Sequence, residues 1–178
     1  MRTRSRTVSK PDVGTIYVGV DNGMSGGLVA LRDGEIVAKL PMPVQVTRKG
    51  NEANVLEVWH WLLGTCMCAG VDLRDMLLVI EEPAGSRFPK MATSMAGCFH
   101  ALRAMCEVHG VRHHRTTPQA WQKAMLNAKA GKTKEAALVK ARAIWPQEKW
   151  LPTPKCSKPH DGLIDAALIA EWARRERL

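Results

Sequence analysis

The stretch that most constrains this chain is residues 16–27, IYVGVDNGMSGG, in which an apolar run leads directly into a glycine-rich turn. Ile16, Val18 and Val20 alternate with other residues, and β-branched and aromatic residues suit a pleated, mostly buried strand. We therefore expect a strand that ends at Asp21 and a sharp turn through the glycines behind it. A carboxylate in this place is a natural ligand for a hard metal ion, and it is equally suited to cap the turn.

The composition limits the class of protein. At 178 residues the chain is long enough for one domain with a sizeable core, and the hydrophobic fraction of 46% agrees. Lys and Arg number 26 against 17 for Asp and Glu, so the net charge of +9 indicates a polyanionic partner, nucleic acid before membrane. No apolar run is long enough to span a bilayer, and the Arg-rich N-terminus lacks the apolar segment of a signal peptide. We expect a cytoplasmic protein without a membrane partner.

The cysteines favour reduced thiols over disulfides. They are odd in number and lie mostly in apolar, helix-like contexts, as buried thiols do. A zinc site made from Cys66, Cys68, Cys156 and His160 lacks a recognisable paired spacing, and we do not expect one.

Periodicity and turn residues predict the order of the elements. Asp33-Gly34 is a strong hairpin signal, so strands over 28–32 and 35–40 should follow the first strand as an antiparallel meander. Residues 1–12 should form a basic, flexible tail, which leaves one domain over 13–178. The later expected elements are a loop over 44–51, a helix over 52–68, a strand over 76–80, a helix over 93–109, a strand over 111–115, helices over 119–126 and up to about 145, a loop over 147–159 and a final helix over 160–175.

Further acids stand at the ends of two of these elements. Glu81 and Glu82 follow the second buried strand, and alternation allows only one of them to face a site at its end. Asp161 and Asp165 are four residues apart at the start of the final helix, so they share one face, although Asp161 also suits the helix cap. The residues after them are small or apolar, so this acid pair needs a compensating positive charge, which a divalent ion would supply.

Lysines and arginines, with few acids among them, gather in the middle of the chain and after the second acidic strand end. This excess of positive over negative charge favours contacts with phosphates over a merely solvated surface. The candidate DNA-binding residues are Arg87, Lys90, Lys123, Lys129, Lys132 and Lys134.

Several strings, taken together with the element order, resemble one known family. These strings are IYVGVDNG, LLVIEEP, SMAGCFHALRAM, TPQAWQKAML and HDGLIDAALIAEWAR. They are similar to the RuvC-like Holliday-junction resolvases of the ribonuclease H-like superfamily, and within them to the phage-encoded members. The resemblance implies an α/β protein of the ribonuclease H-like fold, with a mixed five-stranded sheet of three antiparallel and then two parallel strands, flanked by helices.

The resemblance also implies the site. It assigns Asp21, Glu81, Asp161 and Asp165 as catalytic metal ligands, with Glu82 as the competitor of Glu81. Cellular RuvC proteins place the last two acids three residues apart, whereas the spacing of four found here is associated with the phage type. Converging carboxylates can hold two Mg²⁺ ions about 3.5 to 4 Å apart, for which Mn²⁺ should substitute, and no small-molecule cofactor is expected. His160 could transfer a proton or only pack.

The activity that the resemblance implies is that of a Mg²⁺-dependent endodeoxyribonuclease in DNA recombination and repair, in the host cytoplasm if the chain is phage-encoded. It would resolve four-way junctions by paired symmetric nicks that leave 5′ phosphates and 3′ hydroxyls. The symmetry of a junction implies a homodimer, with the helix over 93–109 as the expected interface. The alternatives are a nuclease of this fold for flaps, forks or RNA/DNA hybrids, and a non-catalytic nucleic-acid-binding module. The string DNGMSGG also resembles the phosphate loop of actin-like ATPases. Those proteins need two such domains to enclose a nucleotide, and this chain is too short for both.

Overall fold

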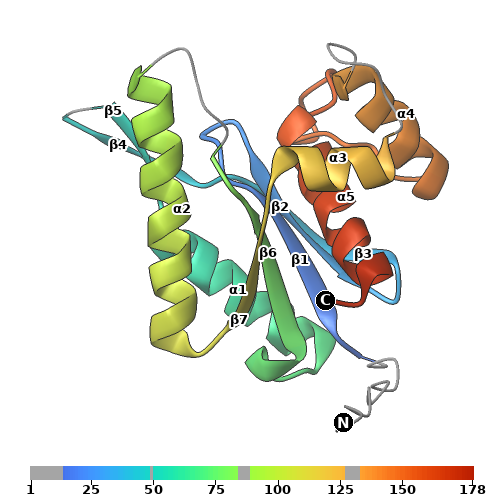
Figure 1. Cartoon of the computed structure of the whole chain (residues 1–178), viewed down its shortest axis with the longest axis horizontal. Coiled ribbons are helices and arrows are strands. Elements are labelled where there is room, and N and C mark those ends of the chain that lie inside the picture. Colours follow the sequence, from blue (N-terminus) through green and yellow to red (C-terminus); the bar gives the residue numbers. More distant parts are fainter. Residues whose placement is uncertain (1–13, 49, 84–88, 127–132) are drawn as a thin grey trace, which may run out of the picture.

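A mixed five-stranded sheet forms the centre of the protein (Figure 1). The computed structural model describes residues 14–48, 50–83, 89–126 and 133–178, with the side chains of 89–91 left out. The strand order is β3-β2-β1-β6-β7, with β1 antiparallel to β2, β2 antiparallel to β3, and β6 parallel to both β1 and β7. The predicted mixed sheet of three antiparallel and then two parallel strands is therefore confirmed. The strands are β1 (Ile16–Asp21), β2 (Gly27–Arg32), β3 (Glu35–Pro41), β6 (Met76–Glu81) and β7 (Arg112–Thr116).

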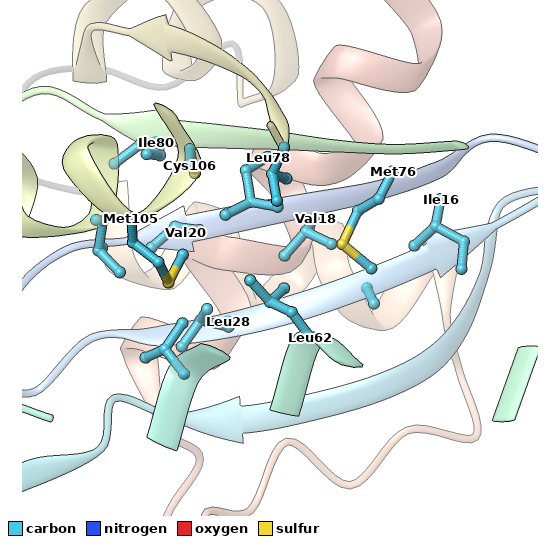
Figure 2. Close-up of a cluster of buried hydrophobic side chains, with 14 of the residues drawn as sticks. Ile16, Val18, Val20, Leu28, Leu62, Met76, Leu78, Ile80, Met105 and Cys106 are labelled. Carbon is cyan, nitrogen blue, oxygen red and sulfur yellow. The ribbon is translucent and has the colours of Figure 1, made fainter. Parts of the chain in front are cut away.

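Helices cover both faces of the sheet, because the central strands are apolar on both sides. On one face lie α1 (Val55–Ala69) and α2 (Pro89–His109), and on the other α3 (Pro118–Met125), α4 (Thr133–Ile144) and α5 (Asp161–Glu176), while a short 3₁₀ helix η1 (Leu73–Asp75) precedes β6. Figure 2 shows alternate residues of β1 and β6 meeting Leu62 of α1 and Cys106 of α2. The residues between them, such as Leu77 and Val79, pack with α5 instead. None of the described helices is long and apolar enough to cross a membrane.

Helix α5 crosses β1 with no side chain between the two backbones. A β-carbon placed on Gly19 would lie 2.0 Å from the backbone oxygen of Ala166 and 2.5 Å from the nitrogen of Ala170. Any side chain on residue 19 would therefore push the helix away from the strand. The residues of α5 that face the sheet are small and buried, Ala166 and Ala170 among them, which matches this close approach.

The main error of the sequence prediction concerns residues 44–51, which we expected to form a loop. They belong to a separate antiparallel hairpin of β4 (Val44–Thr47) and β5 (Gly50–Ala53). Each strand has only four residues and exposes the central two, so the brief alternation in VQVT could not be told from a loop.

Two helix starts were also placed wrongly. Helix α1 begins at Val55 rather than at residue 52, because the Asn54 side chain accepts a hydrogen bond from the Glu57 N–H at 3.3 Å and caps the helix. Helix α2 begins at Pro89, four residues before the predicted start. The five cysteines are free, as expected, although Cys68 is exposed. The predicted tail over 1–12 lies outside the described residues.

Candidate active site

Asp21 and Glu81 end neighbouring parallel strands on the same face of the sheet. Val20 of β1 is paired with Ile80 of β6, so the residues that follow them stand at the same level. Alternation turns Asp21 to the face of Gly19, which α5 covers, and turns Glu81 to the face of Leu77 and Val79. The next residue, Glu82, lies 3.6 Å from the Arg115 guanidinium. Of the two adjacent glutamates, the structure thus places Glu81 on the side of Asp21.

Helix α5 brings its acids to this point because two glycine-containing segments touch. A β-carbon on Gly162 would lie 2.4 Å from the α-carbon of Gly26 and 2.5 Å from the backbone oxygen of Ser25. A β-carbon on Gly26 would lie 2.1 Å from the backbone oxygen of Asp21. The first turn of α5 therefore rests directly on the turn that follows β1. This contact holds Asp161, directly before Gly162, and Asp165, one turn later, near Asp21.

The cap of α5 is His160. The Nδ1 of its side chain accepts a hydrogen bond from the backbone N–H of Leu163 at 3.2 Å. The backbone N–H of His160 donates to the backbone oxygen of Trp150 at 2.8 Å. Asp161 is the first residue inside the helix, so the alternative that Asp161 is the cap is wrong. Because Nδ1 accepts a hydrogen bond, the neutral imidazole carries its proton on Nε2. The suggested part of His160 in proton transfer stays a prediction.

Burial and mutual repulsion disfavour the charged forms of the inner acids. Burial raises the pKa of Asp21, although the Gly23 N–H at 3.2 Å lowers it in part. Burial, with smaller contributions from Asp21 and Asp165, raises the pKa of Glu81 to about 7. Burial followed by the charges of Asp21 and Asp161 raises the pKa of Asp165 to about 7. The acids of β1, β6 and α5 are therefore close enough to repel one another.

One cation stands beside these acids. Lys134 of α4 donates a hydrogen bond from Nζ to Oδ2 of Asp161 at 2.6 Å, and both side chains are more than half exposed. The positive charge of Lys134 also lowers the pKa of Asp21 and of Asp165, less strongly than burial raises them. The site thus combines an outer ion pair with inner acids that the ion pair compensates only in part.

Two solved structures of RuvC from Thermus thermophilus resemble this chain. The one in complex with a Holliday junction substrate has a TM-score of 0.57 and 19% sequence identity, and covers 92% of this chain and 95% of that chain. The other has a TM-score of 0.57 and 18% identity, and covers 92% of this chain and 97% of that chain. The chain has the fold of RuvC. Comparisons with models of protein families and with curated protein sequences give no match.

The match with RuvC confirms the predicted ribonuclease H-like fold over most of the chain. At this level of identity the likeness concerns the fold, so the roles of individual residues depend on the geometry of this chain. In this chain, partly buried acids gather at the ends of β1 and β6 and on the first turns of α5.

The donor chemistry of the site fits a hard divalent ion, because every candidate ligand is a carboxylate. The positions do not yet form a coordination shell: among the described residues, no three His, Cys, Asp or Glu side chains lie close enough together to hold one metal ion. The same finding gives no support to a zinc site at the cysteines. Burial and the neighbouring acids raise the pKa values of Glu81 and Asp165, and a bound cation would favour their charged forms.

Two residues that support the site were missed in the sequence. Asn22 is fully buried and donates from Nδ2 to the backbone oxygen of Glu81 at 2.5 Å, which ties the end of β1 to the end of β6. Trp121 of α3 donates from Nε1 to Oε1 of Glu81 at 2.6 Å. These partners lie 59 and 40 residues apart in the chain, so no local pattern could reveal them.

The structure describes the side chains of two of the six predicted DNA-binding residues. Lys123 on α3 and Lys134 on α4 are exposed, as phosphate-binding residues must be. The side chain of Lys90, and Arg87, Lys129 and Lys132, lie outside the described residues. The set stays a prediction.

The raised pKa values predict how the metal-free protein responds to pH. In the unfolded chain Glu81 and Asp165 ionise near their ordinary pKa values of 4.5 and 3.8, whereas in the folded protein they ionise near 7. Between these values the folded state holds more protons, so the free energy of unfolding must fall as pH rises and level off above about 7. Each carboxyl group contributes on the order of 3 kcal/mol to this loss.

Chemical denaturation in the presence of a chelator, at about pH 5 and about pH 8, measures this loss. Asp165→Asn should reduce it, and Asp33→Asn, which changes an exposed acid, should not. If Asp165→Asn left the loss of unfolding free energy between the two pH values unchanged, the raised pKa of Asp165 would be contradicted.

Proposed function

We propose that this protein is a metal-dependent endonuclease that cleaves branched DNA, and that the four-way junction is its substrate. The observation that carries the proposal is that Asp21, Glu81 and Asp165, from β1, β6 and α5, lie near enough to repel one another at one end of a sheet with the RuvC fold. A RuvC of this fold has been solved with a Holliday junction substrate. The net charge of +9 suits a DNA ligand.

In this proposal Asp21, Glu81, Asp161 and Asp165 hold divalent ions, with Mg²⁺ as the natural choice and Mn²⁺ as a substitute. When bound, such ions supply the positive charge that stabilises an in-line displacement at phosphorus and leaves a 5′ phosphate and a 3′ hydroxyl. The chain itself orients the ligands: the Gly23 N–H fixes one oxygen of Asp21, and the Gly162 contact fixes the place of Asp165. The inner acids are partly buried, which strengthens their attraction for a cation.

In this proposal Lys134 has two partners in turn. Without DNA its ammonium pairs with Asp161, and it is exposed enough to turn towards a DNA phosphate when DNA binds. An exposed ion pair of this kind contributes little stability, so the rearrangement costs little.

Paired nicks in a junction need two active sites, so we propose a homodimer. Helix α2 is the candidate interface, because it carries small residues such as Gly97 and exposes Val108, which is 78% accessible to solvent.

The test compares substrates under one set of conditions. The purified protein is mixed with end-labelled four-way junction, Y-fork, linear duplex and RNA/DNA hybrid, with Mg²⁺, with Mn²⁺ or with a chelator. We expect symmetric nicks in the junction only when a divalent ion is present. Cutting restricted to the fork or the hybrid would show that the four-way junction is not the substrate, while metal-dependent cleavage would stand. Binding without cutting in any condition would favour a non-catalytic module.

A further inference from the structure

Trp121 is a buried aromatic residue whose polar atom contacts the candidate site. The side chain is 1% exposed, and its Nε1 donates a hydrogen bond of 2.6 Å to Oε1 of Glu81. Buried indole groups usually find some acceptor, but here the acceptor is an acid at the point where the strand ends. The contact lowers the pKa of Glu81, against the larger opposite effect of burial.

The fold delivers Trp121 to this place by a short route. In β7, Thr116 is paired with Glu81 of β6, and its backbone oxygen accepts the N–H of Glu82 at 2.7 Å. Helix α3 begins two residues later, with Thr117 as the cap and Pro118 at the first helical position. The first turn of α3 therefore lies over the carboxyl end of β6, and Trp121 reaches back to Glu81.

Glu81 is thus held from two directions. Asn22 fixes its backbone oxygen, and Trp121 fixes Oε1 of its side chain. The second oxygen, Oε2, accepts no hydrogen bond from any residue that the structure describes. A carboxylate with one oxygen fixed by a donor has lost most of its freedom to rotate, so the other oxygen keeps one position relative to Asp21 and Asp165.

We propose that Trp121 is a positioning residue for a metal ligand: its indole N–H holds Oε1 of Glu81 so that Oε2 is presented to the divalent ion. The inference rests on the proposed function, since it takes Glu81 as a ligand. Outer contacts of this kind orient metal ligands, and their loss typically weakens metal binding by about 10- to 100-fold.

A second buried tryptophan provides a matched control. Trp145 is 5% exposed and donates from Nε1 to the backbone oxygen of Gly34 at 2.8 Å, in the turn between β2 and β3. Trp121→Phe and Trp145→Phe each remove one buried indole hydrogen bond and a similar volume. Only the first of them touches an acid of the site.

The test measures metal binding directly as well as cutting. Mn²⁺ is titrated into the DNA-free protein by calorimetry, and the Mg²⁺ concentration for half-maximal junction cleavage is determined alongside. Trp121→Phe should weaken Mn²⁺ binding about 10-fold and raise the half-maximal Mg²⁺ concentration to match, while the KM for the junction stays the same. Trp145→Phe should lower thermal stability and leave both metal values unchanged.

Two further variants separate positioning from folding. Replacement of Trp121 by β-(3-benzothienyl)alanine keeps the bicyclic shape without the N–H, and should reproduce the weaker metal binding in a fully stable protein. In a Glu81→Gln background, Trp121→Phe should cost no further metal affinity, because the two residues act as a unit.

The failures of the two proposals are distinguishable. Equal Mn²⁺ affinity in Trp121→Phe, Trp145→Phe and the unmodified chain overturns the role of Trp121 and leaves the nuclease standing. An unmodified chain that binds no divalent ion overturns the proposed function itself.

Discussion

Asp21→Asn should reduce junction cleavage by about 10³-fold or more, which corresponds to a loss of about 4 kcal/mol of transition-state stabilisation. Asp21 occupies the end of β1, where the charges of Glu81 and Asp165 converge with its own. The asparagine side chain has the same size and keeps one oxygen, so it can still accept the Gly23 N–H. The negative charge that would attract a divalent ion is lost. A single-turnover assay with labelled junction and saturating Mg²⁺ measures the effect.

The same variant should keep or improve binding to the junction in the absence of metal, because it removes one negative charge from a DNA-binding surface. Its thermal stability in a chelator at about pH 8 should be equal or higher, since one member of a repelling group of acids is gone. Asp33→Asn is the matched control: Asp33 is exposed, has φ of 53° in the β2–β3 turn, and asparagine tolerates that conformation. Full cutting by Asp21→Asn would remove Asp21 from the site.

Gly162→Ala is expected to have the second largest effect, although the substitution adds only one methyl group. That methyl group would lie 2.4 Å from the α-carbon of Gly26, so the first turn of α5 has to move away from the turn behind β1. The movement separates Asp161 and Asp165 from Asp21. A displacement of about 1 Å in a site of this kind can cost about 100-fold in rate, and the strain should lower the free energy of unfolding by about 1 to 3 kcal/mol.

Cleavage rates and urea denaturation together check this prediction. Gly64→Ala provides the control, because nothing lies within 4 Å of a β-carbon placed there in the middle of α1. That change should leave cutting unaffected and stabilise the protein by about 0.5 to 1 kcal/mol, as alanine favours a helix over glycine. Normal cleavage by a folded Gly162→Ala protein would show that the contact between α5 and the turn does not position the acids.

The sequence by itself determined the sheet, and it named the candidate acids of the site, because both depend on local patterns. The alternation in residues 16–20 predicts β1, Asp33-Gly34 predicts the hairpin, and the apolar run before Glu81 predicts the buried strand β6. Acids that directly follow such strands must stand at the edge of the sheet, which is why Asp21 and the pair of Glu81 and Glu82 could be named as candidates in advance, while the family resemblance favoured Glu81. The spacing of Asp161 and Asp165 likewise fixes one helix face.

Only the tertiary structure decided the features that depend on partners far apart in the chain. The hairpin of β4 and β5 exists through backbone pairing between two four-residue strands with exposed central residues, which are too short to give a reliable periodic signal. Which residue caps α5 depends on how His160 is held by Trp150, and the contacts of Asn22 and Trp121 with Glu81 join segments that only the packed sheet brings together. Periodicity reports which face of an element is buried, whereas a hydrogen bond between distant residues requires the three-dimensional register of several elements at once.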